Sequence, residues 1–75
     1  MIEAARARIA DLSPAQHGVL LALADGQSNK EIARDLGVTE ATIKAHLTAI
    51  FRKLKVANRA QALLAIQPLI GSPGR

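Results

Sequence analysis

The stretch from Thr39 to Lys55, TEATIKAHLTAIFRKLK, constrains the fold of this chain more than any other. On a helical wheel its large apolar side chains fall in one sector, which contains Ile43, Leu47, Ile50, Phe51 and Leu54. Such a stripe needs a core to pack against. The stretch therefore predicts an amphipathic helix over about 40–54, around which the rest of the chain is organised.

The opposite face of this predicted helix carries small and basic residues. They are Ala41, Lys44, Ala45, Thr48, Arg52 and Lys55, with Thr42, His46 and Lys53 along one flank. No carboxylate follows Glu40, so no acidic side chain in the rest of the helix offsets these charges. A face of this kind can lie in the major groove of DNA, where a bulky or acidic face could not. Taken alone, it is equally compatible with a solvated helix surface.

Length and composition predict a small single domain without disulfides or membrane-spanning segments. Its 75 residues make one domain with one modest core. The absence of cysteine excludes disulfides and agrees with a reducing compartment. No apolar run approaches the roughly 20 residues of a membrane span, and the N-terminus lacks the apolar region of a signal peptide. We therefore expect a cytoplasmic domain with no membrane contact.

The positive charge of the chain is concentrated in one part of the sequence. The net charge is +4, and the segment 41–59 holds five cations and no anion, whereas residues 1–27 hold two arginines and three carboxylates. A local excess of this kind is typical of a surface that binds a polyanion. Phe51 is the only aromatic residue, which argues against proteins that stack the bases of RNA or single-stranded DNA on aromatic side chains.

Boundary residues predict a helix from Pro14 to Ala24. Ser13 suits the N-cap, Pro14 the first helical position, and Gln16 the third position of a capping box. Its inner face is expected to contain Val19, Leu20 and Leu23. Gly18 in its middle departs from good helix-forming sequence and should weaken it by roughly 1 kcal/mol relative to alanine.

A short helix over 29–36 has the same start signal, with Ser28 as N-cap and Glu31 at the third position. Two turns of helix are not stable alone in water, so this one must be stabilised by burial of apolar side chains. The side chains expected to be buried are Ile32, Ala33 and Leu36.

The turn after this short helix joins it to the basic helix. Gly37 supplies the left-handed residue, Val38 is expected to pack inward, and Thr39 caps the next helix. Two helices joined by a three-residue turn with a glycine form a helix-turn-helix. A small Ala33 before the turn and an apolar Ile43 after it support this interpretation. With a basic second helix, the unit predicts DNA binding.

The run from Leu12 to Leu64 resembles the LuxR-type (GerE/NarL/FixJ-like) helix-turn-helix domain of bacterial transcription factors. The blocks SNKEIA, TEATIKAHL and FRKL-V-NR-A carry the resemblance. It implies an all-α, four-helix domain over 13–70, with a three-helix core and a C-terminal dimerisation helix. It also implies the DNA-binding end of a larger regulator, such as a two-component response regulator. The expected partners are inverted-repeat double-stranded DNA, a second copy of the chain, and RNA polymerase.

The resemblance also assigns roles to individual residues. Base edges would be contacted by Lys44, Ala45 and Thr48. Lys44 can donate to O6 and N7 of guanine, and a contact to phosphate alone is the alternative. The DNA backbone would be held by Asn29, Lys30, Thr39, Thr42, His46, Arg52, Lys53, Asn58 and Arg59. Short polar groups near helix N-termini with cations around them suit phosphate contacts, although each residue taken singly could instead be solvated.

The two ends of the chain are less constrained. Residues 1–12 are either a short helix or a linker, and the Gly/Pro-rich 71–75 is expected to be disordered. Asn58 caps the last helix, and Pro68 disfavours helical geometry at Gln67, so this helix is expected to end there.

The candidates for a dimer interface are Val56, Ala60, Leu63 and Leu64. The last helix has two apolar sectors, Ala62/Leu63/Ile66 and Ala60/Leu64, and its sequence does not decide which one faces the core.

Catalytic and metal-binding patterns are missing from the sequence. The two histidines lie on different predicted helices without Cys, Asp or Glu at ligand spacing, and no phosphate loop or nucleophile motif occurs. We therefore expect no enzyme activity, no metal site and no cofactor. Two alternatives are a helical module that binds an acidic protein through its basic face, and a DNA-binding domain like region 4 of a sigma factor. The block KVANRAQALL favours the regulator over the sigma factor.

Overall fold

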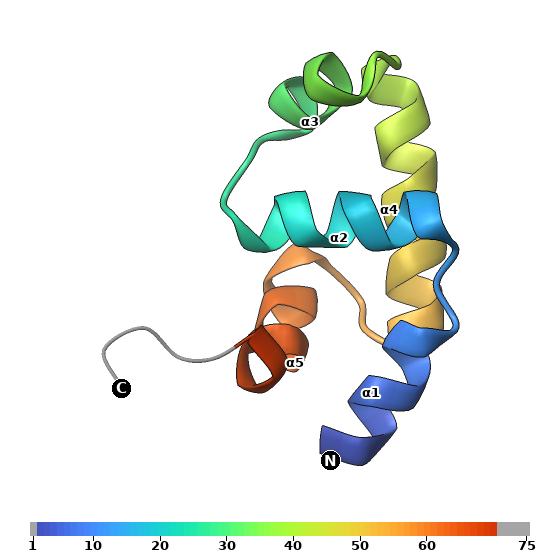
Figure 1. Cartoon of the computed structure of the whole chain (residues 1–75), viewed down its shortest axis with the longest axis vertical. Coiled ribbons are helices and arrows are strands. Elements are labelled where there is room, and N and C mark those ends of the chain that lie inside the picture. Colours follow the sequence, from blue (N-terminus) through green and yellow to red (C-terminus); the bar gives the residue numbers. More distant parts are fainter. Residues whose placement is uncertain (1, 71–75) are drawn as a thin grey trace.

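One long helix touches every other helix of this domain. The computed structural model describes the backbone of residues 2–70 and the side chains of residues 6–66. Five helices lie in this part of the chain: α1 (Ile2–Ala10), α2 (Pro14–Ala24), α3 (Asn29–Leu36), α4 (Glu40–Leu54) and α5 (Arg59–Ile70). α4 packs against the other four, with α3 at its N-terminal end, α2 across its middle and α1 beside its C-terminal half (Figure 1). The predicted all-α, helix-turn-helix fold is confirmed.

The helices begin where their capping residues predict. In α2, the N–H of Gln16 donates to Ser13 Oγ at 3.1 Å, and the N–H of Ser13 donates to Gln16 Oε1 at 3.0 Å. Ser28 and Glu31 form the same reciprocal pair at the start of α3, at 3.1 and 2.8 Å. Thr39 caps α4 by accepting from the N–H of Thr42. Each cap satisfies N–H groups that have no partner within their own helix.

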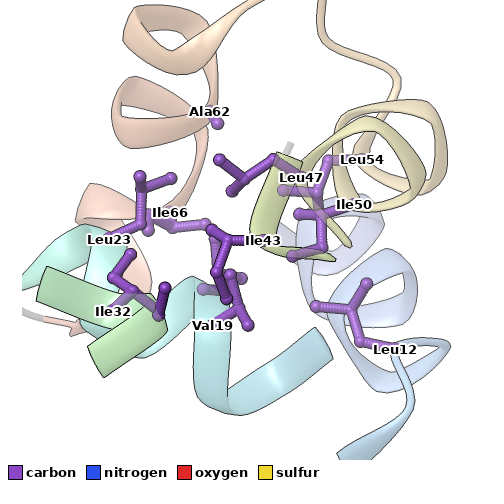
Figure 2. Close-up of a cluster of buried hydrophobic side chains, with 12 residues drawn as sticks. Leu12, Val19, Leu23, Ile32, Ile43, Leu47, Ile50, Leu54, Ala62 and Ile66 are labelled. Atoms are coloured by element: carbon purple, nitrogen blue, oxygen red, sulfur yellow. The ribbon is translucent and has the colours of Figure 1, made fainter. Parts of the chain in front are cut away.

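Among the side chains of residues 6–66, twelve buried apolar ones form one core between the helices. Figure 2 shows α4 in contact with side chains from α2, α3 and α5 and from the α1–α2 linker. α4 contributes Ile43, Leu47, Ile50 and Leu54, so the predicted stripe is confirmed, with Phe51 half-buried at its border. The inner face predicted for α2 is buried as well. Burying a side chain of this size stabilises the fold by about 1.5–3 kcal/mol.

Two predictions of burial near the helix-turn-helix turn are wrong. Leu36 is 50% exposed and Val38 is 40% exposed, whereas Ile32 and Ala33 are buried as predicted. Leu36 is the last residue of α3, and Val38 lies in the turn that joins α3 to α4. Both residues are thus at the end of the domain where these two helices meet. In the described part of the chain α3 packs mainly against α2 and α4, and neither extends over this end. Its contact with α5, from Arg59 to Asn29, lies at the opposite end of α3.

The last helix is longer than predicted. α5 continues to Ile70, so its expected end at Gln67 is wrong. Proline removes one backbone donor and disfavours helical geometry at the residue before it, but does not forbid it. The carbonyl left without its donor belongs to Leu64, a residue that is 68% exposed.

The N-terminal segment forms a helix rather than an extended linker. α1 covers Ile2–Ala10, and its Ile9 packs against the core. The chain then turns into α2 with Leu12 buried, and the N–H of Leu12 donates to the carbonyl of Ile9 at 3.0 Å. The predicted tail 71–75 lies outside the described residues. Between residues 2 and 70, no helix has the length and apolar character needed to cross a membrane.

Candidate nucleic-acid interface

The face of α4 opposite the core is open to solvent. All six of its small and basic residues are exposed, namely Ala41, Lys44, Ala45, Thr48, Arg52 and Lys55. Directly behind them, Ile43 is fully buried and Leu47 is 6% exposed. The core therefore fixes the rotation of α4 about its own axis, because turning the helix would bring these two side chains into water.

Thr48 and Lys44 lie one turn apart on this face and are linked through the backbone. The Thr48 hydroxyl donates to the Lys44 carbonyl at 3.0 Å. Its proton is therefore used within the helix, and its oxygen keeps lone pairs that can accept from an outside donor.

A shallow hollow of about 270 Å³ adjoins the exposed face. It is lined by Asn29, Lys44, Leu47, Thr48, Phe51 and Arg59. Three elements meet there, because Asn29 begins α3, Arg59 begins α5, and the other four belong to α4. The structure thus brings two predicted base-contacting residues together with two predicted phosphate-contacting residues, and no carboxylate lines the hollow.

The guanidinium of Arg59 makes contacts inside the protein. Its Nη2 donates to the carbonyl of Gln27 at 2.6 Å, and its Nη1 donates to Asn29 Oδ1 at 3.3 Å. Arg59 is half-buried, so these bonds tie the start of α5 to the α2–α3 turn and to the first residue of α3.

Lys53 lies on another side of α4, away from the hollow. Its Nζ donates to the Asp11 carbonyl at 3.0 Å and to Gln16 Oε1 at 2.9 Å. Two of its three donors therefore hold the α1–α2 linker and the capping box of α2. Its predicted contact with phosphate has to compete with these internal bonds.

The other predicted phosphate contacts lie on α3, on α4 and just before α4 and α5. Lys30, Thr39, Arg52 and Asn58 are exposed, whereas Thr42 and His46 are half-buried. Thr39 and Thr42 share a hydrogen bond between their hydroxyls at 3.0 Å. Asn58 accepts from the N–H of Gln61 at 2.9 Å, so Thr39 and Asn58 both act as N-caps, as their sequence positions predict.

Comparison with known proteins identifies the family. Residues 10–66 match the family described as bacterial regulatory proteins, luxR family. The chain belongs to the LuxR family. It is a helix-turn-helix domain from a family of DNA-binding transcription regulators, which agrees with the exposed basic face of α4.

Three curated relatives show the level of similarity to this LuxR-family domain. The putative HTH-type transcriptional regulator YhjB of Escherichia coli K12 is 47% identical over 55 residues, which are 73% of this chain and 28% of that protein. The glycerol metabolism activator of Pseudomonas putida is 53% identical over 47 residues, 63% of this chain and 21% of that protein. The nitrate/nitrite response regulator protein NarL of E. coli K12 is 39% identical over 51 residues, which are 68% of this chain and 24% of that protein. The chain thus spans less than a third of each of these relatives.

Some residues in and around the hollow beside α4 could not be identified from the sequence of this LuxR-family domain. Leu47 and Phe51 line the hollow although their spacing assigns them to the inner stripe. Gln27 holds the guanidinium of Arg59 through its backbone carbonyl, a group that any residue type could supply. The hollow exists because α3 and α5 start beside the same part of α4, a tertiary arrangement that helical periodicity does not report.

The structure decides which apolar sector of α5 faces the core. Ala62 is fully buried and Ile66 is 2% exposed, so their sector packs inward. Among the predicted dimer residues, Val56 and Leu63 are half-buried and pack partly against the core. Ala60 and Leu64 are exposed, with Leu64 at 68%.

A larger hollow of about 430 Å³ lies apart from the basic face. Its lining comes from α1, α2, the linker between them and α5, and includes Arg6, Ile9, Leu12, His17, Leu21 and Ile66. None of its lining residues is a predicted DNA contact. Size alone therefore does not locate the interface, which is indicated by charge, exposure and family membership.

Proposed function

We propose that this LuxR-family domain binds double-stranded DNA as the effector domain of a response regulator, with α4 in the major groove. The observation that carries the proposal is the exposed, carboxylate-free face of α4 after Glu40, whose rotation is fixed by the buried stripe behind it. Lys44, Ala45 and Thr48 would reach base edges, because they lie at the centre of that face. One of its relatives, NarL, is a nitrate/nitrite response regulator protein, which supports a response regulator as the parent protein.

The surrounding polar residues would hold the DNA backbone. Lys30 of α3 and Arg52, toward the C-terminal end of the face, are exposed cations, and Thr39, Thr42 and Asn58 offer polar groups at helix starts. Phosphate contacts of this kind set the register of a protein on DNA without reading its sequence.

Two copies of the domain would be needed for useful affinity. A single small module buries only about 600–1,000 Å² of protein surface on DNA. The exposed sector of α5 with Ala60 and Leu64 offers an apolar surface for pairing, with Val56 and Leu63 at its border. A symmetric pair would bind inverted half-sites whose centres are about one helical turn apart. In the cell this would take place in the cytoplasm, with RNA polymerase as a further partner.

Recovery of bound duplexes from a random pool tests this function directly. The sequences recovered should share an inverted repeat, and log K for a recovered duplex should fall linearly with log salt by about 0.9 per neutralised phosphate. A matched chain carrying Lys44→Glu and Arg52→Glu, which introduces acids on the same face, should recover nothing. A pool without any shared sequence, or an affinity that does not depend on salt, would refute the proposal.

A further inference from the structure

The contact between Arg59 and Asn29 determines which way the asparagine amide is turned. A guanidinium has only donors, so the atom of Asn29 that faces it must be the amide oxygen. The amide nitrogen, Nδ2, therefore faces away from Arg59. Among the hydrogen bonds of the described residues, none uses Asn29 Nδ2, so both of its hydrogens remain available to an outside acceptor.

Arg59 is held in place more firmly than a single contact would allow. Its second bond, from Nη2 to the Gln27 carbonyl, is the shorter of the two at 2.6 Å. The backbone of Gln27 is itself fixed, because its N–H donates to the carbonyl of Ala22 at 3.2 Å at the end of α2. The guanidinium is thus fastened to the α2–α3 turn, and from there it reaches Asn29 at the edge of the hollow beside Lys44 and Thr48.

We infer that Arg59 is a positioning residue, which holds the Asn29 amide with its oxygen inward so that Nδ2 donates to a DNA phosphate. Arg59 then neutralises no phosphate itself. This role rests on the proposed function, because it assumes that DNA lies over the hollow. It replaces the expectation that both residues contact the DNA backbone independently.

The salt dependence of binding separates this role from a direct phosphate contact. A cation that neutralises a phosphate contributes about −0.9 to the slope of log K against log salt. Arg59→Gln should lower the affinity for a short random-sequence duplex at about 50 mM salt but leave the slope unchanged. In an Asn29→Ala background, Arg59→Gln should cause no further loss, because the group that it positions is gone.

Asn29→Asp provides a second test that does not depend on the stability of an Arg59 variant. Aspartate keeps an oxygen acceptor for Arg59 but lacks the Nδ2 donors and carries a negative charge. The variant should unfold at a temperature no lower than that of the original chain. It should nevertheless bind the duplex about tenfold or more weakly, because a hydrogen bond to a charged phosphate is lost. Arg52→Gln, which removes an exposed cation of α4, is the control for loss of charge alone.

Three results would overturn the inference. They are a slope that becomes less steep by about 0.9 in Arg59→Gln, an equal loss of affinity from Arg59→Gln with and without Asn29→Ala, and unchanged binding by Asn29→Asp. If the original chain bound no duplex at low salt, the proposed function would fail and the role of Asn29 with it. Binding by the original chain with independent losses in the two variants would refute the positioning role only.

Discussion

Replacing Lys55 by glycine should stabilise the domain. Lys55 ends α4 in the left-handed region, with φ 59° and ψ 45°, where L-residues are disfavoured. The residues that follow α2 and α3 in the corresponding position are Gly26, with φ 88°, and Gly37, with φ 71°. The three ends also share one hydrogen-bond pattern, which at α4 runs from the N–H of Val56 to the carbonyl of Phe51 at 2.9 Å. The same turn is thus made twice with glycine and once with a strained lysine.

The expected gain follows from two opposing terms. The left-handed conformation costs an L-residue roughly 1–2 kcal/mol. Glycine avoids this cost but loses more conformational entropy on folding, by roughly 0.5–1 kcal/mol. Lys55→Gly should therefore raise the free energy of unfolding by about 0.5–1 kcal/mol, and the melting temperature by about 2–8 °C in a domain of this size.

Thermal unfolding followed by far-ultraviolet circular dichroism measures this effect. Lys55→Gln is the matched control, because it removes the charge but keeps the Cβ atom and the strain, so its melting temperature should not rise. Gly37→Ala is the reverse test. No atom lies within 4 Å of a Cβ added at Gly37, so any loss there would come from the backbone conformation alone. A melting temperature for Lys55→Gly at or below that of the original chain, or an equal rise in Lys55→Gln, would refute the reasoning.

Four further predictions concern single residues. Lys44→Ala should weaken binding to a recovered duplex more than to a random one in parallel titrations, because the ammonium lies at the centre of the exposed face; equal losses would mean a phosphate contact. Lys53→Met should lower the melting temperature, because Nζ donates to the Asp11 carbonyl and to Gln16 Oε1. It should change the slope of log K against log salt by less than the roughly 0.9 expected from the loss of one phosphate contact. Gly18→Ala should stabilise α2 by about 1 kcal/mol in denaturant unfolding, since a Cβ at this exposed helical position meets nothing within 4 Å. The pKa of Glu31 is lowered by hydrogen bonds from Ser28, mainly from its backbone N–H and then from its side chain. The stability that this carboxylate contributes is therefore present above the ordinary pKa of glutamate and is lost as the pH falls through the lowered pKa. Glu31→Gln, which cannot be protonated, should show a smaller drop in melting temperature on acidification than the original chain.

The helices that carry the helix-turn-helix could be predicted because their signals are local. Ser13, Ser28 and Thr39 cap their helices through bonds that span three residues, and Gly37 ends α3 by its own backbone preference. The core stripe of α4 follows from helical spacing alone. Neither kind of signal needs knowledge of distant parts of the chain, so the bounds of α2, α3 and α4 and the exposed face of α4 could be derived from the sequence.

The predictions that failed or stayed open concern relations between distant segments. Spacing places Leu36 on the same side of α3 as Ile32, but burial requires a neighbour that reaches the end of the helix, and none of the described elements does. The two bonds of Arg59 span 30 and 32 residues, and those of Lys53 span 42 and 37. Contacts at such separations depend on how helices pack, so a basic residue that acts inside the protein cannot be told by sequence from one that faces a ligand.

This distinction changes how the charge of the interface should be counted. The segment 41–59 contains five cations, but the side chains of Lys53 and Arg59 are bonded within the protein. In the described part of the chain, Lys44, Arg52 and Lys55 make no such side-chain bonds and are exposed. A cation that must break two internal bonds to reach a phosphate gains less from doing so than one that is already free. The electrostatic attraction between this domain and DNA should therefore follow the exposed cations of α4, and a slope predicted from all five charges would be too steep.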